Sequence, residues 1–126
     1  VLAKGLADMG VLTVSAEESM KPEIGLHRRW TLHGVSHHLG LDVHDCAQAR
    51  KEMYLDAPLR EGMVLTVEPG LYIQPDDELF APEYRGIGIR IEDDVLVTAD
   101  GCRNLSENIP RHPDEIEKWM KSVLGR

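Results

Sequence analysis

Apolar residues recur at helical spacing at the two ends of the chain. Residues 1–10 have this spacing and finish on a glycine that suits a helix C-cap. Residues 113–123 open with proline, carry two acidic residues in the first turn and place a lysine near the end, an arrangement that complements the helix dipole. The pattern therefore predicts helices over residues 1–10 and 113–123.

Three segments between these helices have the composition of β-strands. Residues 41–44 alternate apolar and polar side chains, residues 62–73 include a nearly continuous β-rich run, and residues 86–98 form a second long run. A turn is predicted at residues 99–101. The remaining segments are mixed or polar and are predicted to be loops, irregular helix or connections: residues 11–30, 47–61 and 74–85.

The strand over residues 86–98 separates its side chains by type. Ile87, Ile89 and Ile91 face one way, while Arg90 and Glu92 face the other. A buried face that carries charges is costly unless the charges pair with each other or bind a metal. This pattern is the local reason to look for a site on this strand.

The order of elements is helix, several antiparallel strands, helix. This order predicts an α+β fold in which helices lie on one face of a curved, mostly antiparallel sheet. With 126 residues the chain is at most one ordinary domain.

Composition narrows the classes of partner. The chain is 42% hydrophobic and 29% charged, as soluble globular proteins are, and its net charge is −8. The negative charge argues against nucleic acid and against an anionic membrane surface as partners, and no apolar run approaches a membrane span. Val1 opens directly on a predicted helix, so we expect no signal peptide, and the natural N-terminus is expected elsewhere. Cys46 and Cys102 lack a CxxC spacing, which favours a reducing, cytoplasmic setting.

Candidate chemistry is concentrated in three segments, residues 33–37, 66–70 and 88–94, which supply histidine and glutamate side chains. One imidazole and two carboxylates suit Mn²⁺, Mg²⁺, Zn²⁺ or Fe²⁺. Three ligands hold one ion poorly, and a pair of ions needs further ligands and bridging carboxylates. The chain therefore has the character of part of a two-metal hydrolase site.

Four motifs in order resemble the C-terminal half of aminopeptidase P, a branch of the pita-bread (creatinase/aminopeptidase) metallopeptidases. They are residues 33–37, 40–45, 62–72 and 85–94. The Gly-Leu-Asp-Val-His-Asp run favours this branch over methionine aminopeptidase. The resemblance implies that residues 1–126 form the C-terminal part of a catalytic metallopeptidase domain, a single incomplete domain.

The resemblance also implies a metal centre. Its family holds two divalent ions, manganese in the usual case, with two aspartates, one histidine and two glutamates. The matching metal ligands here are His37, Glu68 and Glu92, and the two aspartates are expected upstream of the chain. The spacing of Asp42 and Asp45 does not match that aspartate pair, so the chain alone is expected to hold one ion or none.

Four residues take catalytic roles by the same resemblance. His33 and His44 match histidines that line the substrate site, Arg90 matches an arginine that braces the metal carboxylates, and Glu68 matches the general base. Histidines that lie beside a metal site without binding the metal are also often purely structural hydrogen-bond partners. His38 departs from the tryptophan common in the branch and is expected to be a packing or surface residue, while Tyr72 suits the core as well as a site.

The resulting hypothesis is a metallopeptidase that releases the N-terminal residue from peptides with proline in second position, by means of a hydroxide activated by two metals. Prolidase, which cleaves Xaa-Pro dipeptides, and a non-catalytic pita-bread module that binds protein remain alternatives. The chain alone is expected to be inactive. Uncovered apolar faces and an open sheet edge favour a homo-oligomer.

Overall fold

The structure is a computed structural model that describes residues 1–46 and 49–125. The chain divides into two compact units, the first built from residues 1–35 and 68–90 and the second from residues 36–67 and 91–126. No helix in the described part of the chain is long and apolar enough to cross a membrane.

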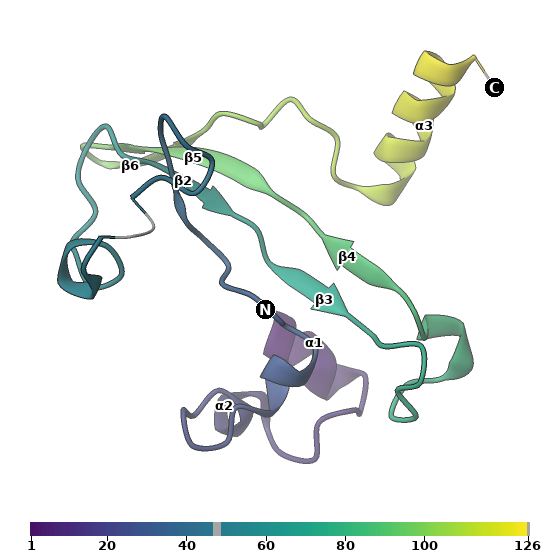
Figure 1. The fold of residues 1–126 in the computed structure, drawn as a ribbon. Coiled ribbons are helices and arrows are strands. Elements are labelled where there is room, and N and C mark those ends of the chain that lie inside the picture. The colour runs from purple at the N-terminus through teal and green to yellow at the C-terminus, as the bar shows by residue number, and fades with distance from the viewer. Residues whose placement is uncertain (47–48, 126) are drawn as a thin grey trace. The chain divides into compact units, whose positions relative to one another are not determined.

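The first unit combines short helices with a two-stranded antiparallel ribbon, β3 and β4 (Figure 1). Its elements are α1 (Leu2–Asp8), α2 (Ala16–Ser19), the 3-10 helices η1 (Leu26–Arg29) and η3 (Pro82–Tyr84), and the strands β3 (Gly70–Tyr72) and β4 (Gly88–Arg90).

A small apolar core holds the first unit together. Leu6 of α1 is buried with Trp30, Ile73 and Phe80, and the rings of Trp30 and Phe80 meet edge to face with centroids 5.5 Å apart. Ala3 is buried on the same side of α1, three residues before Leu6. This spacing is why the short helix forms against the core.

The second unit is built on a four-stranded antiparallel sheet in the order β1-β2-β5-β6. Its strands are β1 (His38–Leu39), β2 (Val64–Val67), β5 (Asp93–Thr98) and β6 (Gly101–Asn104), and its helices are η2 (Lys51–Met53) and α3 (Pro113–Leu124). Helix α3 has proline at its first turn and ends on Gly125 in the left-handed conformation, at φ +66°, as the sequence predicts.

Several predictions of element type are confirmed. Helices α1 and α3 lie where helical spacing places them, the turn at residues 99–100 joins β5 to β6, and all strand pairs are antiparallel. The α+β class is therefore correct. The predicted connection over residues 47–61 includes residues 47–48, which lie outside the described residues.

The two long predicted strands are each divided. Residues 62–73 contain β2 and β3 with Glu68 and Pro69 between them, and residues 86–98 contain β4 and β5 with Ile91 and Glu92 between them. Pro69 has no N–H to give to a ladder, which explains the first break. In both cases the break lies at a glutamate of the candidate site.

The strand predicted at residues 41–44 is wrong, because this segment forms bends and turns. Asp45 N–H donates to the carbonyl of His38 at 3.1 Å, and Gly40 N–H donates to the carbonyl of Asp42 at 3.2 Å. The carboxylate of Asp45 occupies the space where a side chain at Gly40 would stand. The alternating pattern therefore folds into a tight loop after β1.

A buried carboxylate fixes the loop between β3 and β4 to the core of the first unit. Asp77 is 3% exposed and accepts hydrogen bonds from Arg29 Nε and Nη2 at 3.1 Å each, from Trp30 Nε1 at 2.6 Å and from Leu79 N at 3.1 Å. The Arg29 guanidinium holds the pKa of Asp77 below its ordinary value, helped by Trp30 and Leu79 and opposed by burial.

Replacing Asp77 with asparagine is expected to lower the free energy of unfolding by about 2 kcal/mol at neutral pH, because a charge-assisted network is lost. A depressed folded pKa contributes stability that is present above the unfolded pKa and disappears as pH falls through the folded pKa. The gap between the parent protein and Asp77→Asn should therefore close below about pH 4. Urea unfolding across pH measures it.

Asp76→Asn is the matched control, since Asp76 is exposed in the same loop. It removes the same charge and should leave stability within about 0.5 kcal/mol of the parent. Equal effects of the two substitutions would contradict the role given to Asp77.

Candidate metal centre

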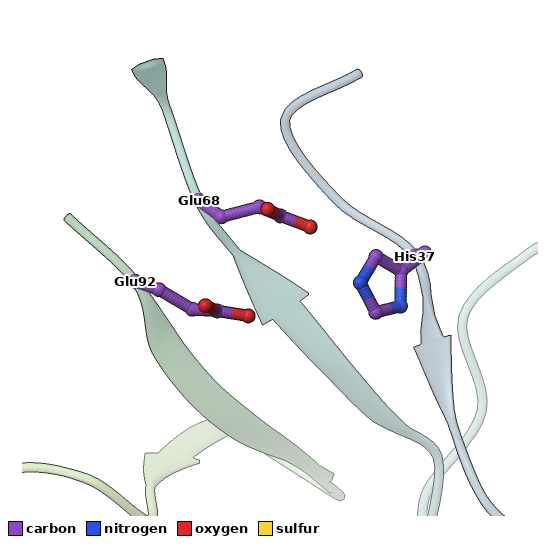
Figure 2. Close-up of side chains that lie close together, drawn as sticks. All are labelled: His37, Glu68 and Glu92. Carbon is purple, nitrogen blue, oxygen red and sulfur yellow. The ribbon is translucent and has the colours of Figure 1, made fainter. Parts of the chain in front are cut away.

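His37, Glu68 and Glu92 lie together. Each offers one ligand atom, and these three atoms are all within 4.8 Å of one another. Figure 2 shows a ring nitrogen of His37 facing the two carboxylates, which extend side by side toward it. Among residues 1–46 and 49–125, no other group of three or more histidine, cysteine and acidic side chains has the spacing of a metal site. These three side chains therefore converge in the structure, as the sequence predicts.

The register of β2 and β5 explains why the two glutamates meet. Val67, the last residue of β2, is paired with Asp93, the first residue of β5. Glu68 follows Val67 and Glu92 precedes Asp93, so continued antiparallel register sets these two residues opposite each other. Sheet pairing over the preceding residues thus fixes the spacing of the carboxylates.

The third ligand comes from the neighbouring strand β1. His38 is paired with Leu65 of β2, and His37 lies immediately before it. The N–H of Thr66 donates to the carbonyl of His37 at 2.9 Å, and the N–H of His37 donates to Thr66 Oγ1 at 3.0 Å. Thr66 is buried, so its side chain locks the His37 backbone to β2.

A hydrogen bond sets the tautomer of His37. Nδ1 of His37 lies 3.1 Å from the carbonyl oxygen of His38, and a carbonyl can only accept. Nδ1 therefore carries the proton in the neutral ring, which puts the lone pair on Nε2. Histidines that bind metals commonly donate their other nitrogen to a backbone carbonyl in this way.

Arg90 orients Glu68. Arg90 Nη1 donates to Glu68 Oε2 at 2.8 Å, while Glu68 N donates to the carbonyl of Val35 at 2.8 Å. The Glu68 residue is 9% exposed, so a charge-assisted bond at this position fixes the carboxylate plane and offsets its burial. The predicted contact of Arg90 with a glutamate of the site is present.

Burial of the charged strand face differs from the sequence expectation. Arg90 and the rest of β4 are exposed, and Glu92 is exposed as well. Ile89 on the other face is also exposed, at 55%. The expected buried charged face is therefore wrong, because β4 pairs with β3 alone in a two-stranded ribbon; Glu68 is the buried acid of the group.

The two other candidate histidines have different surroundings. The ring of His44 meets the ring of His37 edge to face, with centroids 4.4 Å apart. His33 is bonded to Tyr72 instead: its Nε2 lies 2.7 Å from the Tyr72 hydroxyl, and its Nδ1 lies 2.6 Å from the carbonyl of Gly34. In the neutral ring Nδ1 donates, so Nε2 accepts from the hydroxyl.

Gly70 explains why His33 and Tyr72 can approach this closely. A Cβ at Gly70 would lie 2.6 Å from the Tyr72 hydroxyl and 2.7 Å from His33 Nε2. The glycine after Pro69 therefore makes room for the pair. The sequence alone does not identify the Tyr72 hydroxyl as the partner of His33. The signal in the sequence that points to this close contact is the glycine two residues before Tyr72.

His38 and Asp45, which the sequence does not assign to the metal site, lie outside the group formed by His37, Glu68 and Glu92. His38 packs against Tyr54, with ring centroids 4.9 Å apart, and its N–H donates to the Tyr54 hydroxyl at 3.1 Å. The expectation that His38 is a packing residue agrees with this contact. Asp45 folds back toward Gly40.

The donor set fits a divalent cation. A nitrogen and two carboxylate oxygens at about 2.0–2.2 Å from one ion lie at most about 4.4 Å from each other. The observed limit of 4.8 Å is within a small side-chain adjustment of that value. Two anionic ligands also balance a dication, with the nearby Arg90 as a partner of Glu68. Three donors leave positions for ligands from elsewhere.

Comparison with known proteins also indicates a metallopeptidase. The profile of metallopeptidase family M24 matches residues 4–99. Xaa-Pro aminopeptidase 1 of Streptomyces coelicolor is 59% identical over 125 residues, which are 99% of this chain and 25% of that protein. Xaa-Pro aminopeptidase of Escherichia coli is 46% identical over 123 residues, which are 95% of this chain and 26% of that protein.

Solved structures show the same likeness. Aminopeptidase P from E. coli with the inhibitor Pro-Leu superimposes with a TM-score of 0.83 at 43% identity, covering 99% of this chain and 27% of that one. The zinc-substituted E. coli enzyme in complex with product gives 0.82 at 45% identity, again over 99% and 27%. The fold is therefore that of a pita-bread fragment, and the chain spans about a quarter of the length of these relatives.

Proposed function

The chain belongs to metallopeptidase family M24, and from this membership we propose that the protein containing it releases the N-terminal residue from peptides with proline in second position. The convergence of His37, Glu68 and Glu92 is the observation that carries the proposal. Because the relatives are about four times longer, the proposal concerns a longer protein that contains this chain, called the full-length protein below.

We propose that two divalent ions, Mn²⁺ in particular, act in the full-length protein. His37 would bind through Nε2, and Glu68 and Glu92 through carboxylate oxygens, with the two remaining anionic ligands supplied by the rest of that protein. Such a metal pair supplies Lewis acidity and makes water acidic enough to react near neutral pH.

The residues of this chain take the following proposed roles. Glu68 accepts the proton of the attacking water, since Arg90 fixes its carboxylate in one orientation. His44, beside His37, donates a hydrogen bond to the peptide carbonyl. His33, whose ring nitrogens are bonded to Gly34 and Tyr72, lines the proline side of the substrate. Arg90 balances the charge of the carboxylates and touches Glu68 directly.

Location and assembly are further proposals. Cys46 and Cys102 are both free and exposed, which supports a reducing, cytoplasmic setting. Apolar side chains of β4 and its neighbours are exposed, including Ile87, Ile89 and Ile91 at 40–55%. Surface of this kind supports self-association of the 126-residue chain into a homo-oligomer.

The test is a peptide assay on the full-length protein. With added Mn²⁺ it should cleave a tripeptide of the form Xaa-Pro-Xaa, should leave the matched Xaa-Ala-Xaa tripeptide intact, and should lose activity with a chelator. Cleavage of Xaa-Pro dipeptides alone would identify a prolidase instead. Metal binding without any cleavage would support the non-catalytic module and overturn the proposal.

A further inference from the structure

The segment after β6 folds back onto the start of β5. Asp93, the first residue of β5, accepts a hydrogen bond from Ser106 Oγ at 2.8 Å and forms an ion pair with Arg111. Arg111 Nη2 also donates to the carbonyl of Ser106 at 3.1 Å. One arginine and one serine thus connect residues 106–111 to a single carboxylate, and we call this connection the brace.

Backbone bonds add to the brace. The N–H of Asp94 donates to Ser106 Oγ at 3.0 Å, and the N–H of Leu105 donates to the carbonyl of Asp94 at 2.8 Å. Ser106 itself is held by Asn104, whose side-chain oxygen accepts from its N–H at 2.8 Å. The first two residues of β5 are therefore fixed from the side of β6 as well as by their pairing with β2.

The brace lies next to a candidate ligand without being part of the ligand set. Glu92 is joined directly to Asp93, and side chains of successive residues in an extended chain point to opposite faces. The carboxylate of Asp93 therefore turns toward Ser106 and Arg111, while the carboxylate of Glu92 turns toward His37 and Glu68. Fixing Asp93 fixes the backbone from which Glu92 extends.

We propose that Arg111 and Ser106 are positioning residues that hold Glu92 in its metal-binding place by anchoring Asp93. The inference rests on the proposed function, because it needs a metal at this group. Glu92 directly precedes the first residue of β5, so the position of its backbone depends on the position of Asp93. The bonds of Asp93 to Ser106 and Arg111 fix that position.

The test measures metal affinity in the full-length protein with Arg111→Met and with Ser106→Ala. Loss of a group that supports a metal ligand typically weakens binding about 10-fold or more, so the Kd for Mn²⁺ by calorimetry should rise by about that factor in both variants. Arg111→Lys keeps the charge and should recover part of the affinity. The electron paramagnetic resonance spectrum of bound Mn²⁺ should broaden in Arg111→Met as the ligand geometry becomes less uniform.

Arg103→Met is the matched control. Arg103 is an exposed arginine of β6, and among the described residues it takes part in no ion pair. The control should bind Mn²⁺ as the parent does. Thermal unfolding of the metal-free variants separates a general loss of stability from a loss of metal affinity.

The outcomes are distinguishable. Lower melting temperatures with unchanged Mn²⁺ affinity in Arg111→Met and Ser106→Ala would overturn the inference and leave the proposed function intact. Failure of the unmodified protein to bind any divalent ion would overturn both. If Arg111→Met does not fold, the Kd of the milder Ser106→Ala variant for Mn²⁺ tests the inference by itself.

Discussion

Glu68→Gln in the full-length protein is expected to lower kcat/KM for an Xaa-Pro peptide by about 10³-fold, within the range that a positioned general base contributes. The substitution keeps the shape of the side chain and an oxygen that can accept from Arg90, which lies 2.8 Å from Glu68 in the parent. It removes the negative charge that a dication requires and the base that accepts a proton. Steady-state kinetics with saturating Mn²⁺ measures the loss.

Glu92→Gln separates the two roles of a glutamate at this centre. Glu92 is proposed as a ligand only, so its variant should bind Mn²⁺ more weakly and recover activity as the metal concentration is raised. Glu68→Gln should not recover, because added metal does not replace a base. Recovery of both variants to the same extent would contradict the assignment of Glu68 as the base.

Glu61→Gln is the matched control for both variants. Glu61 is exposed in the turn that precedes β2, and the same change of charge there should leave kcat/KM unaltered. A loss in the control as large as that in Glu68→Gln would show that net charge, rather than the position of the carboxylate, determines the rate.

The sequence predicts the parts of the fold whose signals are local. Helix α3 is marked by Pro113 at its start and Gly125 after its end, and both residues act through their own backbone geometry. Pro69 is equally visible, but a single strand predicted over residues 62–73 disregards the absence of an N–H at that position. The division into β2 and β3 places Glu68 where one strand ends.

The loop after β1 shows the limit of periodicity. Residues 41–44 alternate as a strand does, but a strand also needs a partner for its backbone groups. Asp45 instead bonds back to His38, and this closure depends on the space that Gly40 leaves. Period-two patterns of four residues therefore do not decide between a short strand and a tight loop.

The candidate site was predicted through motif resemblance, whereas its supports depend on tertiary structure. The spacing of His37, Glu68 and Glu92 carries no physical signal until the register Val67 to Asp93 is known. The hydroxyl of Tyr72 on His33 and the guanidinium of Arg111 on Asp93 join segments far apart in sequence. These contacts form only when the chain folds, and a single sequence does not show which of its residues will pair.

The 126-residue chain by itself is expected to show no measurable turnover of an Xaa-Pro peptide at millimolar Mn²⁺. The described residues bring together three donors, and three donors hold at most one ion with incomplete geometry. A second dication nearby needs further carboxylates that bridge the pair and neutralise its charge. Calorimetry should accordingly report one weak Mn²⁺ site or none, against two in the full-length protein.

Two controls give this expectation its meaning. Far-ultraviolet circular dichroism of the isolated chain must show that helices and sheet are formed, so that inactivity is not a result of unfolding. Glu92→Gln in the isolated chain should abolish whatever weak Mn²⁺ binding is present, because one of the three donors is then neutral. Turnover by the isolated chain at a rate near that of the full-length protein would mean that other residues of this chain complete the metal pair, and the ligand assignment would have to be replaced.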